Sequence, residues 1–288
     1  MNSYTIFADS ACDIAPSILN EWGVKFVNLT FAFQSDGIEK LNSEVEAKEF
    51  YDRMRSGDIA RTSAANMESF KDAFKEELDK GNDIIYLGFS SGLSTTYNSG
   101  VMAANELKED YPERKIFTVD TLSASAGFGL LLHLAVEKKA GGATIEEIAA
   151  FVEDIKLNIC HWFTVDDLEY LKRGGRVSPT VAFVGGLLGI KPVMHMDDEG
   201  HLINMSKARG RTAALKALVD KFGELAVDST KGPVYICHGD CIDDVNQVKN
   251  LFKENYGVEV ELVTDVGPVI GSHSGPGTLA IFFIGKER

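Results

Sequence analysis

The first half of the chain alternates short apolar runs with stretches in which apolar residues recur at helical spacing. This alternation is typical of βα units, which build parallel sheets. It predicts strands over 4–8, 25–33, 83–87 and 115–120, and helices over 44–55 and 123–140.

The pattern changes after the glycine pair Gly141-Gly142 and a predicted helix over 145–156. Residues 194–203 predict a β-hairpin that turns at Asp198-Glu199-Gly200. Further along, strands over 234–237 and 258–263 are predicted on either side of a helix over 243–255. This half therefore predicts a mixed or antiparallel sheet with helices on one face.

The change in pattern predicts two α/β domains, 1–157 and 158–288. A chain of 288 residues with 44% apolar content is long and apolar enough to form a hydrophobic core in each of two such domains. The net charge is −14, from 43 acidic and 29 basic residues, which argues against nucleic-acid binding and against docking on anionic membranes.

Two further features predict a cytoplasmic protein without stable membrane insertion. No signal peptide is visible at the N-terminus, and the apolar runs over 126–136 and 181–190 are too short to span a bilayer. The four cysteines are too few and too scattered for a disulfide scaffold.

Residues 267–277 are rich in glycine and proline and contain His273 between Ser272 and Ser274. Such a segment favours turns and close backbone approach, which allow several N–H groups to point at one ligand. We predict that it forms one wall of an oxyanion pocket. The alternative is an ordinary turn around a histidine with satisfied hydrogen bonds.

Other polar clusters lie where strands end and helices begin. In residues 61–66, either Thr62 or Ser63 is predicted to cap the next helix, and the other hydroxyl is free to face a ligand. Residues 88–99 carry five hydroxyl side chains before Tyr97, more than capping needs, which favours ligand binding. In residues 120–129, helix capping and close backbone packing are the favoured explanation for the hydroxyl and glycine residues.

Cationic side chains gather in residues 166–176, which predict a short helix that ends at Gly174-Gly175. Arg173 and Arg176 are suited equally to the negative end of the helix dipole and to a phosphate or protein partner. The apolar segment 181–190, rich in glycine, is suited to core packing or to lining a slot for an elongated apolar ligand.

One enzyme signature is present. Residues 88–92 match Gly-x-Ser-x-Gly, and Asp265 and His273 follow in the order found in α/β-hydrolases, so a serine hydrolase with nucleophile Ser90 is an alternative. Against it, no His-Gly-Gly-Gly segment precedes the motif. Residues 237–241 could supply three metal ligands but lack a second cluster, and no phosphate-binding loop occurs, so neither metal nor nucleotide cofactor is predicted.

Taken together, these segments resemble the DegV family of bacterial fatty-acid-binding proteins, which includes the acyl-carrier subunits of fatty-acid kinase. The resemblance runs nearly from end to end, and it depends on residues 9–13, 62–63, 90–99, 168–176 and 267–277.

The resemblance implies a two-domain α/β protein without catalysis of its own. It would bury one long-chain fatty acid, hold the carboxylate between the domains and present it to a kinase that forms an acyl phosphate, a phospholipid precursor. A small-molecule sensor with the same pocket and no kinase is a further possibility. Hydroxyls, N–H groups or a protonated His273 would compensate the carboxylate.

The resemblance also assigns residues by motif. It implies that Thr62 and Ser94 are the main carboxylate contacts, that Ser63, Ser91, His273 and Ser274 lie nearby, and that Arg173, with Arg176 beside it, serves the kinase and the phosphate.

Overall fold

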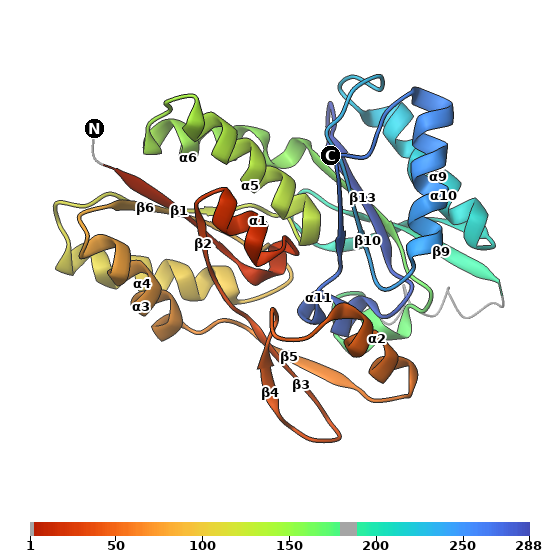
Figure 1. Cartoon of the computed structure of the whole chain (residues 1–288), viewed down its shortest axis with the longest axis horizontal. Coiled ribbons are helices and arrows are strands. Elements are labelled where there is room, and N and C mark those ends of the chain that lie inside the picture. Colours follow the sequence, from red (N-terminus) through yellow and green to blue (C-terminus); the bar gives the residue numbers. More distant parts are fainter. Residues whose placement is uncertain (1–2, 179–188) are drawn as a thin grey trace.

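Three β-sheets organise the part of the chain, residues 3–178 and 189–288, that this computed structural model describes (Figure 1). Their strand orders are β2-β1-β6-β7, β4-β3-β5 and β10-β9-β8-β13-β11-β12. We call the first two sheets and their helices the N-terminal lobe, and the third sheet and its helices the C-terminal lobe.

The first sheet is parallel, as predicted for this half of the chain. Helices lie on both of its faces (Figure 1), and β6, one of its two central strands, is buried along its whole length. The strands are β2 (Val24–Val27), β1 (Tyr4–Asp9), β6 (Asp83–Gly88) and β7 (Ile116–Asp120). The helices are α1 (Pro16–Glu21), α3 (Met67–Leu78), α4 (Thr96–Asp110), α5 (Ser125–Ala140) and α6 (Ile145–Ile155), with the 3-10 turn η1 (Ser10–Cys12) after β1.

The second sheet is small and antiparallel, with strands β4 (Glu39–Leu41), β3 (Thr30–Phe33) and β5 (Ala60–Ser63), and with helix α2 (Ala47–Arg55) beside it. The single strand predicted over 25–33 is wrong, because the chain leaves β2 and enters β3 in a different sheet. The Leu29 N–H donates to Ser10 Oγ at 2.9 Å, and no strand includes residues 28–29.

The third sheet is mixed, as predicted. It contains β10 (Leu202–Arg209), β9 (Ile190–Met196), β8 (Ile159–Thr164), β13 (Leu279–Ile284), β11 (Val234–His238) and β12 (Leu262–Asp265). The associated helices are α7 (Glu169–Arg173), α9 (Arg211–Leu225), α10 (Ile242–Tyr256) and α11 (Pro268–Ser274), and η2 (Lys156–Asn158) leads into β8. The predicted hairpin turns where expected, since the Gly200 N–H donates to the Asp197 carbonyl.

Side chains alternate across the third sheet and serve two different cores. Trp162, Ile281 and Phe283 pack with the helices α9 and α10. Their neighbours Phe163 and Phe282 face the opposite way and join the core of the N-terminal lobe. Because alternate residues of a strand point to opposite faces, one face of this sheet is turned toward the N-terminal lobe.

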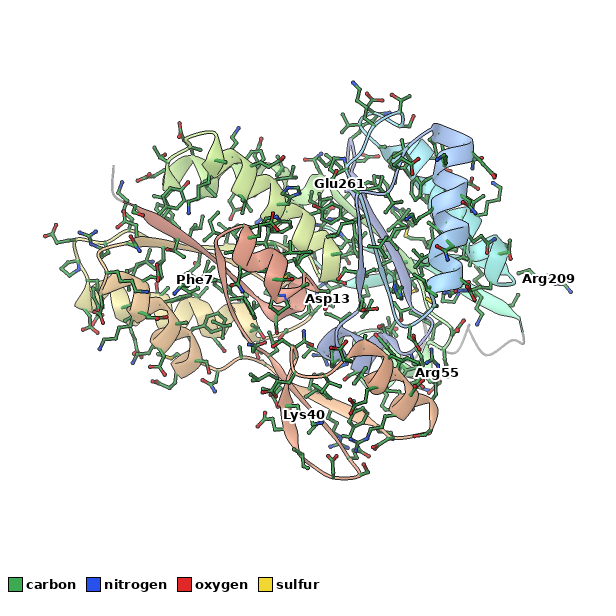
Figure 2. The ribbon with its side chains drawn as sticks, viewed as in Figure 1. Phe7, Asp13, Lys40, Arg55, Arg209 and Glu261 are labelled. Atoms are coloured by element: carbon green, nitrogen blue, oxygen red, sulfur yellow. The ribbon has the colours of Figure 1, made fainter. Side chains whose placement is uncertain are left out.

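The two lobes share a continuous hydrophobic core, which includes Phe7 from β1 and Phe282 from β13. Figure 2 shows Asp13 near the place where the lobes meet. Strands of the third sheet begin at Ile159, but the domain boundary at 157/158 stays a prediction. None of the helices in residues 3–178 and 189–288 has the length and apolar character of a bilayer span.

Candidate functional site

A cavity of about 250 Å³ lies between the two lobes. Its floor is the third sheet, where lining residues come from five adjacent strands. Since neighbouring strands lie about 4.8 Å apart, this floor extends about 19 Å across the sheet. The floor side chains, in strand order, are Leu202, Met196, His161, Phe163, Ala280, Phe282 and Cys237.

The remaining walls bring together six of the side chains that the sequence predicted for a ligand site. They come from β5, the loop before α4, the segment after α7, and α11. The six are Thr62, Ser63, Ser94, Arg176, His273 and Ser274. Their roles in binding stay predictions, but segments far apart in the chain do meet at one cavity.

Thr62 and His273 form the central contact of this polar group, with Thr62 Oγ1 2.8 Å from His273 Nε2. His273 Nδ1 is buried without a hydrogen-bond partner among the described residues. A buried N–H without an acceptor costs more than a bare ring nitrogen, which favours the tautomer that carries its proton on Nε2. In that tautomer His273 donates to Thr62, and the Thr62 hydroxyl proton remains available to a ligand.

His273 carries no charge at neutral pH. Burial, and secondly the nearby Arg176, lower its pKa to about 4. The expectation that a protonated His273 compensates a carboxylate is therefore not supported by this environment. Among the described residues that line the cavity, Arg176 is the cationic side chain.

Arg173 and Arg176 have different surroundings, which the sequence could not separate. Arg176 Nε donates to the Leu93 carbonyl at 3.1 Å, and no carboxylate in the described ranges forms an ion pair with this guanidinium. Arg173 is exposed, with its guanidinium 5.4 Å from the Tyr170 ring centroid, and it lies outside the cavity lining. Arg176 thus lines the cavity, whereas Arg173 is exposed to solvent.

Ser94 lines the cavity just before α4, whereas Ser91 does not reach it. Ser94 Oγ accepts the Thr96 N–H at 3.2 Å and lies 2.9 Å from Thr96 Oγ1. Ser91 is exposed, and its N–H donates to Asp120 Oδ1 at 3.3 Å. The structure therefore does not bring Ser91, a predicted ligand contact, to the cavity.

The predicted helix cap at Thr62 or Ser63 is wrong. Both residues belong to β5, where they pair with β3. The cap of α3 is Asn66, whose side chain accepts the Ser69 N–H at 2.9 Å. Both hydroxyls are thus free of capping and line the cavity.

Close approach explains several glycines near His273. A Cβ at Gly174 would lie far inside van der Waals contact of His273 Nδ1. One at Gly275 would collide with the Tyr170 ring. The glycine-rich segment 267–277 therefore packs tightly against α7 and the residues around it, as its composition predicted.

The residues of the alternative hydrolase site do not meet. Ser90 is buried, and its hydroxyl donates to the Gly200 carbonyl at 3.0 Å. The histidine that pairs with Asp265 is His238, at 3.6 Å, whereas His273 contacts Thr62. A nucleophile needs its base within hydrogen-bond reach, and this arrangement does not provide it.

Within the described residues, no group of three or more histidine, cysteine or acidic side chains could hold a metal ion. Residues 237–241 are the end of β11 and the turn after it. The segment 181–190, a candidate slot, lies outside the described residues except for Gly189 and Ile190.

Sequence reasoning missed the apolar floor of the cavity. Its side chains come from strands far apart in the chain, and only the alternation of their residues hinted at a second buried face. It also missed a polar cluster in which the Ser125 hydroxyl donates to Asp13 Oδ2 and lies 3.1 Å from Cys237 Sγ. Burial raises the Asp13 pKa to about 7.

Comparison with known proteins places these features in a family. A family model described as "Uncharacterised protein, DegV family" matches residues 3–286. A DegV domain-containing protein of Clostridium perfringens is 41% identical over 289 residues, which cover 100% of this chain and 99% of the relative. A protein of Thermotoga maritima named "Fatty acid-binding protein" is 34% identical over 288 residues and 98% of each chain.

Solved structures agree. A lipid-binding DegV protein of Thermotoga maritima superposes with a TM-score of 0.86 at 31% identity, covering 99% of each chain. A Thermus thermophilus DegV protein, described by its fatty-acid binding, gives a TM-score of 0.88 at 30% identity over 98% of this chain and 99% of its own.

Proposed function

We propose that this chain, which belongs to the DegV family, binds one long-chain fatty acid in the cavity between its lobes. The observation that carries the proposal is the pairing of an apolar floor with a group of hydroxyls, a neutral histidine and one arginine in the same cavity. An elongated apolar molecule with an anionic end has the matching chemistry. Similar proteins of Thermotoga maritima and Thermus thermophilus are described as binding lipids or fatty acids.

The apolar floor supplies the driving force. Each methylene group removed from water contributes ~0.8 kcal/mol, so a tail of roughly fifteen methylenes offers on the order of 10 kcal/mol before the costs of binding. The floor's extent of about 19 Å suits such a tail better than it suits a compact metabolite.

The polar group compensates the carboxylate. A carboxylate taken out of water needs charge-assisted hydrogen bonds. In this proposal Thr62 donates its free hydroxyl proton, Ser94 adds a second hydroxyl, and Arg176 supplies positive charge. Ser63 and Ser274 lie in the same lining, and the buried Ser274 Oγ has no partner among the described residues.

We further propose that the protein is a carrier and not an enzyme, and that a kinase phosphorylates the bound carboxylate. The separation of Ser90, Asp265 and His273 argues against hydrolysis. Arg173, exposed near the cavity's arginine, is suited to contact a protein partner. The acyl phosphate formed would be a precursor of phospholipids. The four cysteines are free thiols, which suits the reducing cytoplasm.

Native mass spectrometry of the purified protein tests the binding proposal. We expect a mass increase that matches one long-chain fatty acid, lost on solvent extraction and restored by adding palmitic acid. Hexadecane, which has the tail but no carboxylate, is the control ligand and should restore less complex. Failure to bind palmitic acid after extraction, with the fold intact by circular dichroism, would overturn the proposal.

A further inference from the structure

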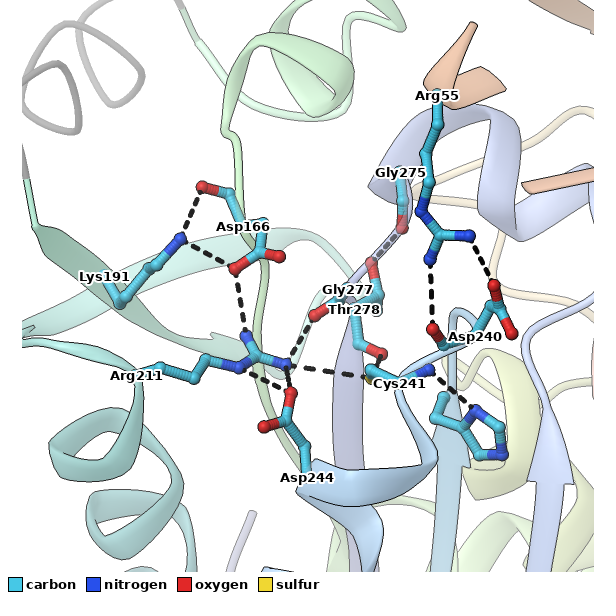
Figure 3. A network of polar contacts seen from close by, with 11 residues as sticks. Arg55, Asp166, Lys191, Arg211, Asp240, Cys241, Asp244, Gly275, Gly277 and Thr278 are labelled. Carbon is cyan, nitrogen blue, oxygen red and sulfur yellow. Dashed lines mark hydrogen bonds and ion pairs between the residues drawn. The ribbon is translucent and has the colours of Figure 1, made fainter. Parts of the chain in front are cut away.

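Arg211, the first residue of α9, contacts three separate segments of the C-terminal lobe (Figure 3). Its Nε donates to Asp244 Oδ2 at 2.9 Å, and its Nη2 donates to the Gly277 carbonyl at 2.6 Å. Its Nη1 has no hydrogen-bond partner among the described residues but lies at ion-pair distance, 3.7 Å, from Asp166 Oδ1, which also accepts from Lys191 at 2.7 Å. One guanidinium thus joins α10, the residues after α11 and the residues before α7.

Two of these segments adjoin the helices next to the polar side chains of the cavity, Thr62, Arg176 and His273, and we call this part of the cavity its polar end. Asp166 lies just before α7, and Arg176 follows that helix. Gly277 lies just after α11, which carries His273, and a Cβ at Gly277 would collide with the Asp166 carboxylate. The contact between Asp166 and the end of the glycine-rich segment therefore sets how closely α7 approaches α11.

The spacing between these two helices determines where the His273 ring lies. Gly174, at the end of α7, packs on Nδ1 with no room for even a methyl group. On the other side, Nε2 contacts Thr62. A small outward movement of α7 would open space beside Nδ1, and His273 could then turn away from Thr62.

We propose that Arg211 is a positioning residue for the fatty-acid head group, acting through α7 and α11 on His273 and Thr62. Arg211 does not line the cavity and touches no ligand itself. The inference rests on the proposed function, because it assigns the carboxylate to the Thr62–His273 contact.

Arginine is suited to this position because its planar guanidinium donates in several fixed directions at once. A lysine ammonium could reach Asp244 or the Gly277 carbonyl, but its flexible stem would not hold both together with Asp166. Arg211 acts on His273 and Thr62 through the packed segments of α7 and α11, and not on the apolar floor. Its loss should therefore weaken binding of the carboxylate more than burial of the tail.

The test compares Arg211→Met with Arg55→Met as a matched control. Arg55 belongs to the same region (Figure 3), where it contacts the Asp240 carboxylate and carbonyl, but it joins α2 to the turn after β11 and not to α7. Delipidated proteins are loaded with 11-(dansylamino)undecanoic acid, and palmitic acid or hexadecan-1-ol displaces this probe. The ratio of the two affinities measures recognition of the carboxylate.

We expect Arg211→Met to reduce the acid-to-alcohol affinity ratio at least tenfold, with the alcohol's affinity changed less than threefold. Arg55→Met should leave the ratio within twofold of wild type. Asp166→Ala, an exposed change, should act in the same direction as Arg211→Met and decides the matter if the arginine variant fails to fold.

A ratio within twofold of wild type in the folded Arg211→Met and Asp166→Ala variants would overturn the inference while leaving fatty-acid binding standing. A wild-type protein that binds neither palmitic acid nor the probe would instead overturn the proposed function, and this inference with it. The two failures are therefore distinguishable.

Discussion

Thr62 and His273 are 211 positions apart in the chain, yet Thr62 Oγ1 and His273 Nε2 lie 2.8 Å apart. Thr62 belongs to β5 in the small sheet of the N-terminal lobe, and His273 to α11 in the C-terminal lobe. The contact thus bridges the two lobes at the polar end of the cavity. A carboxylate bound there would be held by groups from both lobes, and its affinity should depend on each of them.

Thr62→Val and Ser94→Ala should each weaken palmitate binding by about 1–3 kcal/mol, because each removes a hydroxyl donor from a charged acceptor. Displacement of a fluorescent fatty acid measures the change. Ser91→Ala is the matched control, since Ser91 is exposed and lies outside the cavity. Unchanged affinity in both cavity variants would mean that the head group binds elsewhere.

His273 should make the protein less stable as the pH falls. Its pKa is about 4 in the folded protein and about 6.5 when unfolded, so the unfolded chain binds more protons between these values. Acidification from pH 7 to 4.5 therefore costs stability, at most about 3 kcal/mol from this residue. In urea unfolding across this pH range, His273→Gln should lose less unfolding free energy on acidification than wild type does. Equal losses in the two proteins would contradict the low pKa of His273.

Asp13 should have the opposite effect. Burial raises its pKa to about 7, well above its value near 4 in the unfolded chain, so the folded protein binds more protons between these values. Stability then falls as the pH rises through this window, by at most about 4 kcal/mol. Asp13→Asn should gain stability relative to wild type between pH 5 and 8. A difference in unfolding free energy that does not change with pH would refute this prediction.

Ser90 should not react as a nucleophile. Its hydroxyl is buried against the Gly200 carbonyl, and the histidine of the matching motif contacts Thr62. Incubation with a fluorophosphonate probe followed by denaturing mass spectrometry should show no adduct on this residue. A labelled Ser90, absent from a Ser90→Ala sample, would restore the hydrolase as a candidate.

Arg173→Ala should leave palmitate affinity unchanged and reduce acyl-phosphate formation with a fatty-acid kinase at least tenfold. The residue is exposed and outside the cavity, so its loss removes a partner contact and not a ligand contact. Lys172→Ala, an exposed change at the neighbouring position, serves as the control. Weakened palmitate binding in the Arg173 variant would place this arginine at the lipid instead.

The parallel first sheet and the mixed third sheet could be predicted because short apolar runs and helical periodicity recur through the chain. The break between β2 and β3 could not be predicted, because it depends on a side chain nineteen residues earlier in the chain: Ser10 Oγ accepts the Leu29 N–H. The prediction of a helix cap at Thr62 or Ser63 is wrong for a similar reason, namely a contact with a residue far away in the chain. Pairing of Thr62 with Phe31 places it in a strand.

Within the candidate site, six of the side chains that the resemblance implied line one cavity, but the resemblance could not give the orientation of every side chain. Ser90 and Ser91 are adjacent residues of the same type, yet the Ser90 hydroxyl is buried against the Gly200 carbonyl and Ser91 is exposed to solvent. Arg173 and Arg176 likewise differ in their surroundings, since Arg173 is exposed and Arg176 lines the cavity. Such differences depend on loop dihedrals, which residue type alone does not determine.

The glycines packed around His273 leave no space for a larger side chain. One added carbon at Gly174, Gly275 or Gly277 would force apart the packed side chains of His273, Tyr170 and Asp166. Floor residues such as Ala280 and Leu202 line the cavity, so a change in their size would alter the space for the proposed tail. If the cavity holds a fatty acid as we propose, proteins with this fold could come to prefer different tails while they keep the same contacts with the carboxylate.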